Sequence, residues 1–167
     1  MRLAATTGTV SNLFELARRD VGSGEIVTHL RDRWIEPLSR WMRDLNIQPI
    51  VRSIVNVGSR QANWDRVGSA AANQEAIQRA VAEVETFFDE AVSNHADWVA
   101  PFVGLSERGE VVFEWWNDER KLSLYIGPQF TEYVSSWGPH VEDQMDAGVL
   151  GPGKFRDLWT WLKLQTV

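Results

Sequence analysis

Between Pro101 and Gly138 the chain alternates hydrophobic and polar residues in short runs that are separated by turn-forming sequences. Hydrophobic residues recur at every second position, as from Val111 to Trp115, and the breaks fall at glycine or at polar clusters. A period of two predicts strands, and short breaks between strands predict an antiparallel meander. We therefore expect four strands over residues 103–137.

The turns predict how these strands pair. The segment 107–109 suits a three-residue hairpin loop with glycine in the left-handed conformation, which places Val103 opposite Phe113. The segment 117–120 suits a four-residue loop, which places Phe113 opposite Leu124. Both registers put one apolar set on the same face, and a shift of one residue would turn that set to solvent. The predicted core face carries Val103, Leu105, Val111, Phe113, Trp115, Leu122, Leu124, Ile126, Tyr133 and Trp137.

Before the meander, hydrophobic residues recur every three or four positions, which is the period of a helix. This spacing predicts a helix at about residues 25–46, with Pro37 kinking or dividing it. Residues 47–57 fit either an extended edge segment or a short helix, because short apolar runs do not distinguish the two. We treat residues 1–60 as a helical N-terminal segment.

Residues 61–167 then form the predicted meander domain. A clear amphipathic helix is expected at about residues 74–93, with Asn73 as its N-cap. A last helix is expected at about residues 154–164, and residues 139–153 are predicted to be a loop with one helical turn. The chain is thus predicted to be α+β, with a four-stranded antiparallel meander packed against helices.

One part of this arrangement resembles many small uncharacterised bacterial proteins. Those proteins carry a Trp-Asp-Gly-Tyr-Gly-Ala-like loop, a helix, a strand ending in Leu-Glu-Trp and a further alternating strand. The matching segments here are 64–70, the helix near 77–88, Phe113-Glu-Trp115 and 120–125, which span about residues 63–137. The chain departs from the pattern at Arg66 and Val67, where those proteins have Gly and Tyr. The resemblance implies this fold and a bacterial or phage source, and it implies no activity.

Composition narrows the chemistry. The chain has no cysteine, which excludes disulfides, thiolate nucleophiles and cysteine-based zinc sites. Its three histidines lack metal-ligand spacing, and no nucleophile-elbow or phosphate-binding motif is present. We expect no catalytic residue, no metal and no cofactor. The first residues lack the apolar run of a signal peptide, and we expect a cytoplasmic protein without a membrane span.

Charge is divided unevenly along the chain. Residues 1–66 carry ten arginines against seven acidic residues, a balance of +3, whereas residues 67–167 carry seven basic against sixteen acidic residues, a balance of −9. An acidic surface disfavours nucleic acid and favours a basic protein partner.

The face of the meander opposite the core set, called the reverse face below, is the candidate binding surface. It mixes aromatic and charged residues, as protein-binding surfaces do, and the chain's nine tryptophans make an exposed one expected. The predicted partner-binding residues are Trp116, Tyr125, Glu114, Lys121, Glu132 and Val134. The alternative is that the N-terminal helices cover this face, with Trp34 and Trp41 packed on Trp116.

These features favour a non-enzymatic protein that binds and neutralises a partner, of antitoxin, immunity or anti-defence type. A second hypothesis is a metal-dependent nuclease-like enzyme that uses Glu114, Asp118 and Glu119. A third is a structural subunit of a homo-oligomer that pairs through residues 25–46.

Overall fold

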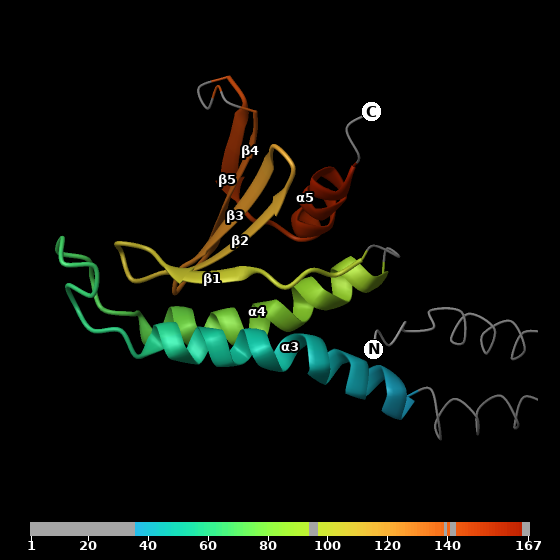
Figure 1. Cartoon of the computed structure of the whole chain (residues 1–167), viewed down its shortest axis with the longest axis horizontal. Coiled ribbons are helices and arrows are strands. Elements are labelled where there is room, and N and C mark those ends of the chain that lie inside the picture. Colours follow the sequence, from blue (N-terminus) through green and yellow to red (C-terminus); the bar gives the residue numbers. More distant parts are fainter. Residues whose placement is uncertain (1–35, 94–96, 139, 141–142, 165–167) are drawn as a thin grey trace, which may run out of the picture. The chain divides into compact units, whose positions relative to one another are not determined.

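The structure is a computed structural model that describes residues 36–93, 97–138, 140 and 143–164. The chain divides into two compact units, residues 1–44 and 45–167. The described elements are three helices and a five-stranded antiparallel sheet (Figure 1). The predicted α+β class is confirmed, and the predicted number of strands is one too few.

Helix α3 (Glu36–Gly58) resolves the ambiguous segment 47–57 as helix. Its buried residues are Ile47, Ile50, Ile54 and Val57, and their spacing of three or four residues is helical. The predicted helix end near residue 46 is wrong, because this stripe continues through Pro49 and joins the hydrophobic core. Residues 25–35 of the predicted helix lie outside the described residues.

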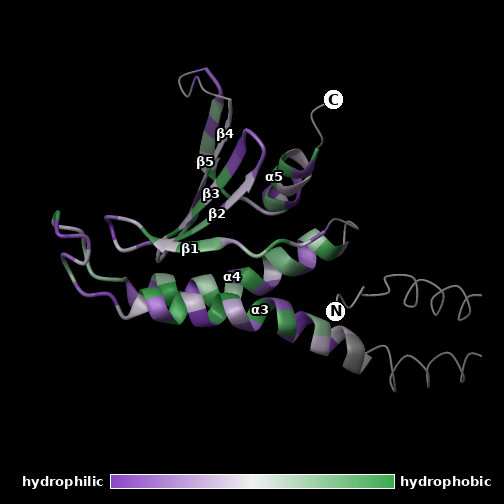
Figure 2. Cartoon of the chain, in the orientation of Figure 1, coloured by the Kyte–Doolittle hydropathy of each residue, from purple (hydrophilic) through white to green (hydrophobic). Residues whose placement is uncertain are grey.

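Helix α4 (Gln74–Ser93) agrees with its predicted bounds. The side-chain oxygen of Asn73 accepts a hydrogen bond from the backbone N–H of Ala76 at 3.1 Å, which satisfies one of the free donors of the first turn. Gly58, the last residue of α3, lies against the side chain of Ile77 in α4. In Figure 2, hydrophobic and hydrophilic residues alternate in colour along α4, as its one-sided burial requires.

The sheet follows chain order. Its strands are β1 (Phe102–Leu105), β2 (Val111–Asn117), β3 (Arg120–Ile126), β4 (Thr131–Trp137) and β5 (Met145–Val149), and each neighbour pairs with the next. The predicted registers are confirmed, since Val103 pairs with Phe113 and Phe113 pairs with Leu124. Gly109 has a φ of 80°, as the predicted three-residue loop requires.

Two predictions about turns and loops are wrong. Asn117 and Arg120 pair directly, so the loop between β2 and β3 is the two-residue turn Asp118–Glu119 rather than a four-residue loop. The region predicted as a loop with one helical turn contains β5, which pairs with β4 from Glu132 to Ser136. The edge of β4 supplies the hydrogen-bond partners that this glycine-containing segment needs in order to be extended.

The core lies between the predicted core face and helices α4 and α5 (Lys154–Lys163). Aromatic rings dominate it: Phe87 of α4 stacks on Phe155 of α5 at 4.4 Å between centroids and meets Phe113 of β2 edge-on at 6.4 Å. Trp115 packs edge-on against Trp159 at 5.7 Å. Such pairs are each worth about 0.5–1.5 kcal/mol beyond the burial of their area.

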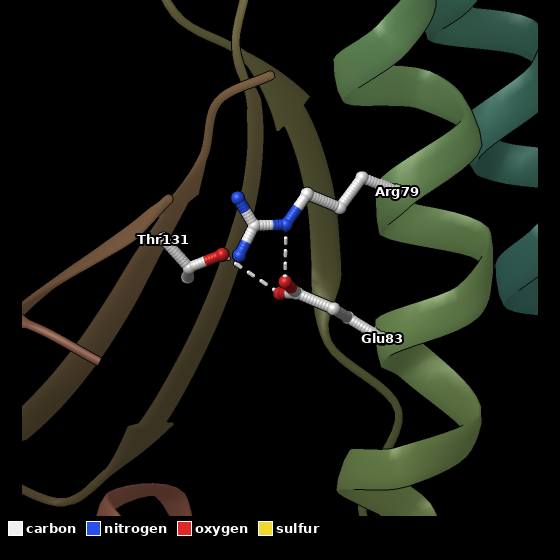
Figure 3. Close-up of polar contacts among 3 residues, drawn as sticks. All are labelled: Arg79, Glu83 and Thr131. Atoms are coloured by element: carbon white, nitrogen blue, oxygen red, sulfur yellow. Dashed lines mark hydrogen bonds and ion pairs between the residues drawn. The ribbon is translucent and has the colours of Figure 1, made fainter. Parts of the chain in front are cut away.

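A polar contact also joins α4 to the sheet at the start of β4. Glu83 accepts a hydrogen bond from the hydroxyl of Thr131 at 2.7 Å and pairs with Arg79 one turn earlier on α4 at 2.6 Å (Figure 3). Glu83 therefore links α4 to the sheet. Thr131 is 1% exposed, and this contact satisfies its hydroxyl inside the core.

Candidate functional site

The pleat places all six predicted partner-binding residues on the reverse face. Glu114 pairs with Ser123 and Trp116 pairs with Lys121 across β2 and β3, and Tyr125 pairs with Glu132 across β3 and β4. Paired residues in an antiparallel sheet point to the same side. Strands β1 and β5 extend this face with Phe102, Gly104, Met145, Ala147 and Val149.

Three of the predicted residues form one contact cluster. The ammonium of Lys121 lies 2.5 Å from the Oε1 atom of Glu114 and 5.2 Å from the centre of the Trp116 ring. The hydroxyl of Ser123 donates to the same carboxylate oxygen at 3.2 Å. Lys121 is thus held by a carboxylate and by an aromatic face at once, which fixes the Trp116 side chain without burying it.

The cluster is completed by a residue that the sequence did not predict. Phe102 of β1 meets Trp116 edge-on at 6.3 Å between ring centroids. Phe102 is 62% exposed and Trp116 is 55% exposed. Two large aromatic side chains that touch each other in solvent form a rigid apolar anchor of the kind that carries binding energy in protein interfaces. We call Phe102, Glu114, Trp116 and Lys121 the aromatic cluster.

The other predicted residues lie across the middle of the face. Tyr125, Glu132 and Val134 are half-buried. Within the described part of the chain, no hydrogen bond or ring contact joins them to the aromatic cluster. Beyond them the face ends at β5, where Met145 and Val149 are exposed. Sequence alternation located the middle of this face, and β5 was missed because its Asp146 and Gly148 have low strand propensity.

The sequence also left open that the N-terminal segment covers the reverse face or forms a homodimer, and that the protein is a nuclease. Residues 1–35, which include Trp34 and half of the segment 25–46 proposed to form a homodimer, lie outside the described residues. Trp41, which belongs to the same proposal, is 56% exposed. The nuclease hypothesis needs Glu114, Asp118 and Glu119 together.

The structure does not gather those carboxylates. Glu114 is paired with Lys121 on the reverse face, whereas Asp118 and Glu119 form the exposed turn at the end of the hairpin. In the described part of the chain, no group of three or more histidine, aspartate and glutamate side chains is arranged to hold a metal ion.

A second ordered feature is the loop that carries the Trp-Asp motif. Asp65 accepts a hydrogen bond from the hydroxyl of Ser69 and further bonds from the backbone N–H groups of Val67 and Ser69 at 3.0 and 3.3 Å. The Ser69 hydroxyl, followed by the Val67 N–H, lowers the pKa of the Asp65 carboxyl below its usual value of 3.8. The guanidinium of Arg60 lies 4.7 Å from the ring centre of Trp64. These contacts give the loop a structural role.

No protein-family model, curated protein or solved structure matches this chain. None of the helices described here combines the length and the apolar character that a membrane-spanning helix needs. The candidate site therefore stands on the geometry of the reverse face.

Proposed function

We propose that the chain is a non-enzymatic protein-binding module that inhibits or neutralises a basic partner protein by covering it with the reverse face. The observation that carries the proposal is the contact between Phe102 and Trp116, two exposed aromatic rings fixed on a pleated surface. Aromatic anchors surrounded by polar residues are typical of the few positions that supply most of the energy of an interface.

The charge of the chain supports a basic partner. Residues 67–167, which include the whole sheet, carry a balance of −9. On the reverse face Glu114 is paired with Lys121, so Glu132 is the acidic residue there that is left for a partner's lysine or arginine. Long-range attraction of this kind raises the association rate and falls with ionic strength. An antitoxin, an immunity protein or an anti-defence protein would act in this way.

The test starts from the partner. The full chain is immobilised, proteins from the native host are captured and identified by mass spectrometry, and the purified partner is titrated against variants by calorimetry. Trp116→Ala is expected to weaken binding by at least about thirtyfold, as truncation of a central aromatic anchor does.

The chain offers a matched control. Trp41 on α3 is as exposed as Trp116, at 56% against 55%, and it lies outside the sheet. Trp41→Ala is expected to leave the affinity unchanged. The proposal fails if Trp116→Ala binds as tightly as the wild type while its circular dichroism and melting temperature are unchanged, or if no captured protein is basic.

A further inference from the structure

The open edge of β5 is the feature of the sheet that nothing in the proposed function uses. β5 is the last strand in the sheet order, so no strand of the described residues lies along one side of its backbone (Figure 1). Natural proteins protect such edges with lysine, proline, bulges, inward-pointing charges or covering segments, because an open edge pairs with other chains. The sequence of β5, Met-Asp-Ala-Gly-Val, contains neither lysine nor proline, and its one charged residue, Asp146, accepts a hydrogen bond from Tyr133 within the same chain.

The hydrogen bonds at both ends of β5 show which of its backbone groups point outward. Leu150 donates to Thr131 at 2.7 Å, and Gln144 accepts from Trp137 at 2.9 Å, so even-numbered residues of this strand bond to β4. In an antiparallel strand, alternate residues direct their N–H and C=O groups to opposite sides. Met145, Ala147 and Val149 therefore direct both groups away from β4. At the other edge of the sheet, the same alternation leaves only Val103 and Leu105 of β1 facing outward.

These three residues are arranged symmetrically, and we propose that β5 pairs with β5 of a second copy of this chain. A two-fold axis at Ala147 sets Ala147 against Ala147 of the second copy, and Met145 against its Val149. Each of the three residue pairs then exchanges two hydrogen bonds, six in all. The two sheets become one continuous antiparallel sheet with both reverse faces on the same side.

The side chains fit this pairing. Met145, Ala147 and Val149 all lie on the reverse face, so the pairs there are apolar, and Met145 and Val149 are exposed in the single chain. Asp146, on the core face, would lie opposite Gly148 of the second copy and not opposite another carboxylate. Its carboxylate is already occupied by the hydroxyl of Tyr133 at 3.0 Å. Like charges directly opposite each other would destabilise the paired strands, and none meet across this pair.

The test measures self-association of the full chain by sedimentation over a range of concentrations. The wild type is expected to form a dimer, and Ala147→Lys and Ala147→Glu are each expected to raise its dissociation constant at least about tenfold, since like charges would meet on the axis. An equimolar mixture of the two variants is expected to restore the dimer as a heterodimer. Trp116→Ala is expected to dimerise as the wild type does, which separates this inference from the proposed function.

A second measurement does not depend on charge. Because the chain has no cysteine, Ala147→Cys introduces a single thiol, and paired residues of this kind lie about 5.5 Å apart between Cα atoms, within disulfide range. Mild oxidation is expected to link this variant into a covalent dimer. Ala82→Cys, at an exposed position of α4, is the matched control and is expected to stay a single chain.

Several results would overturn the inference. It fails if the wild type is monomeric at all concentrations tested, or if the dimer survives both charged substitutions unchanged, which would place the interface elsewhere. It also fails if Ala147→Cys is linked no faster than Ala82→Cys.

Discussion

The ring of Tyr133 in β4 lies directly against Gly148, its cross-strand partner in β5. A Cβ atom on Gly148 would lie 3.2 Å from the Cε1 atom of Tyr133 and 3.3 Å from its hydroxyl oxygen. The ring is held on two further sides, because its hydroxyl donates to Asp146 at 3.0 Å and the ammonium of Lys154 lies 4.9 Å from its centre. Tyr133 therefore fastens the edge strand and the start of α5 to the rest of the sheet.

We predict that Gly148→Ala destabilises the protein by about 1–2 kcal/mol, because the added methyl group meets a ring that cannot move freely. Chemical denaturation of the full chain measures the change. Gly151→Ala is the matched control, since a Cβ atom there meets no atom within 4 Å. Equal stability of the two variants would show that the contact with Tyr133 does not fix β5.

A second relationship joins the hairpin of β2 and β3 to the end of α5. The guanidinium of Arg120 donates to the carbonyl oxygens of Trp161 and Leu164 at 2.6 Å each. The side-chain amide of Asn117 donates to the carbonyl oxygen of Leu162 at 2.7 Å. The last carbonyl groups of a helix lack partners within the helix and favour positive charge.

Arg120→Ala is expected to destabilise the fold by about 1–3 kcal/mol, since it removes two charge-assisted hydrogen bonds. Both hydrogen bonds leave the same nitrogen, Nη1. Arg120→Lys keeps the charge but replaces the planar guanidinium by an ammonium on a shorter side chain, and about half the effect is expected. Thermal unfolding compares the variants. If Arg120→Lys is as stable as the wild type, charge alone accounts for the contact.

A third prediction concerns backbone strain at Arg66, whose φ of 67° lies in the left-handed region. A residue other than glycine costs about 1–2 kcal/mol there. Arg66→Gly is expected to stabilise the protein by about 0.5–1 kcal/mol. The gain is smaller than the strain that is removed, because glycine also increases the conformational entropy of the unfolded chain.

Arg66→Ala serves as the control, because alanine removes the side chain and keeps the strain. Denaturant midpoints measured side by side decide the matter. The prediction is wrong if the alanine variant gains as much stability as the glycine variant, because the gain would then come from the lost arginine side chain.

The sequence predicted those parts of the structure in which the hydrophobic period is regular. Alternation in β2 and β3 determined the register, and therefore that Glu114, Trp116 and Lys121 share a face. The contacts among those side chains depend on rotamers, which periodicity does not specify. Nor does it specify how far Phe102 is exposed.

β5 could not be predicted because its residues do not favour strands. Asp146 and Gly148 have low strand propensity, and the segment is extended because β4 offers a free edge and Tyr133 packs on the glycine. Residues 47–57 were ambiguous for a related reason. Their hydrophobic residues had a helical period, but it is packing against the core that stabilises this segment as a helix.

The last prediction follows from Asp65, whose pKa is lowered chiefly by the hydroxyl of Ser69 and then by the backbone N–H of Val67. A carboxyl group with a lower pKa in the folded state stabilises the fold above its unfolded pKa, about 3.8, and this contribution disappears as pH falls through the lower folded value. We therefore expect Asp65→Asn to have a lower free energy of unfolding than the wild type at pH 6. The difference between the two proteins should become smaller below pH 3.8. Ser69→Ala removes the main cause of the shift and should reproduce part of the effect. Urea denaturation at closely spaced pH values measures it, and a difference that stays constant from pH 6 to pH 3 would show that the Asp65 charge contributes nothing to this loop.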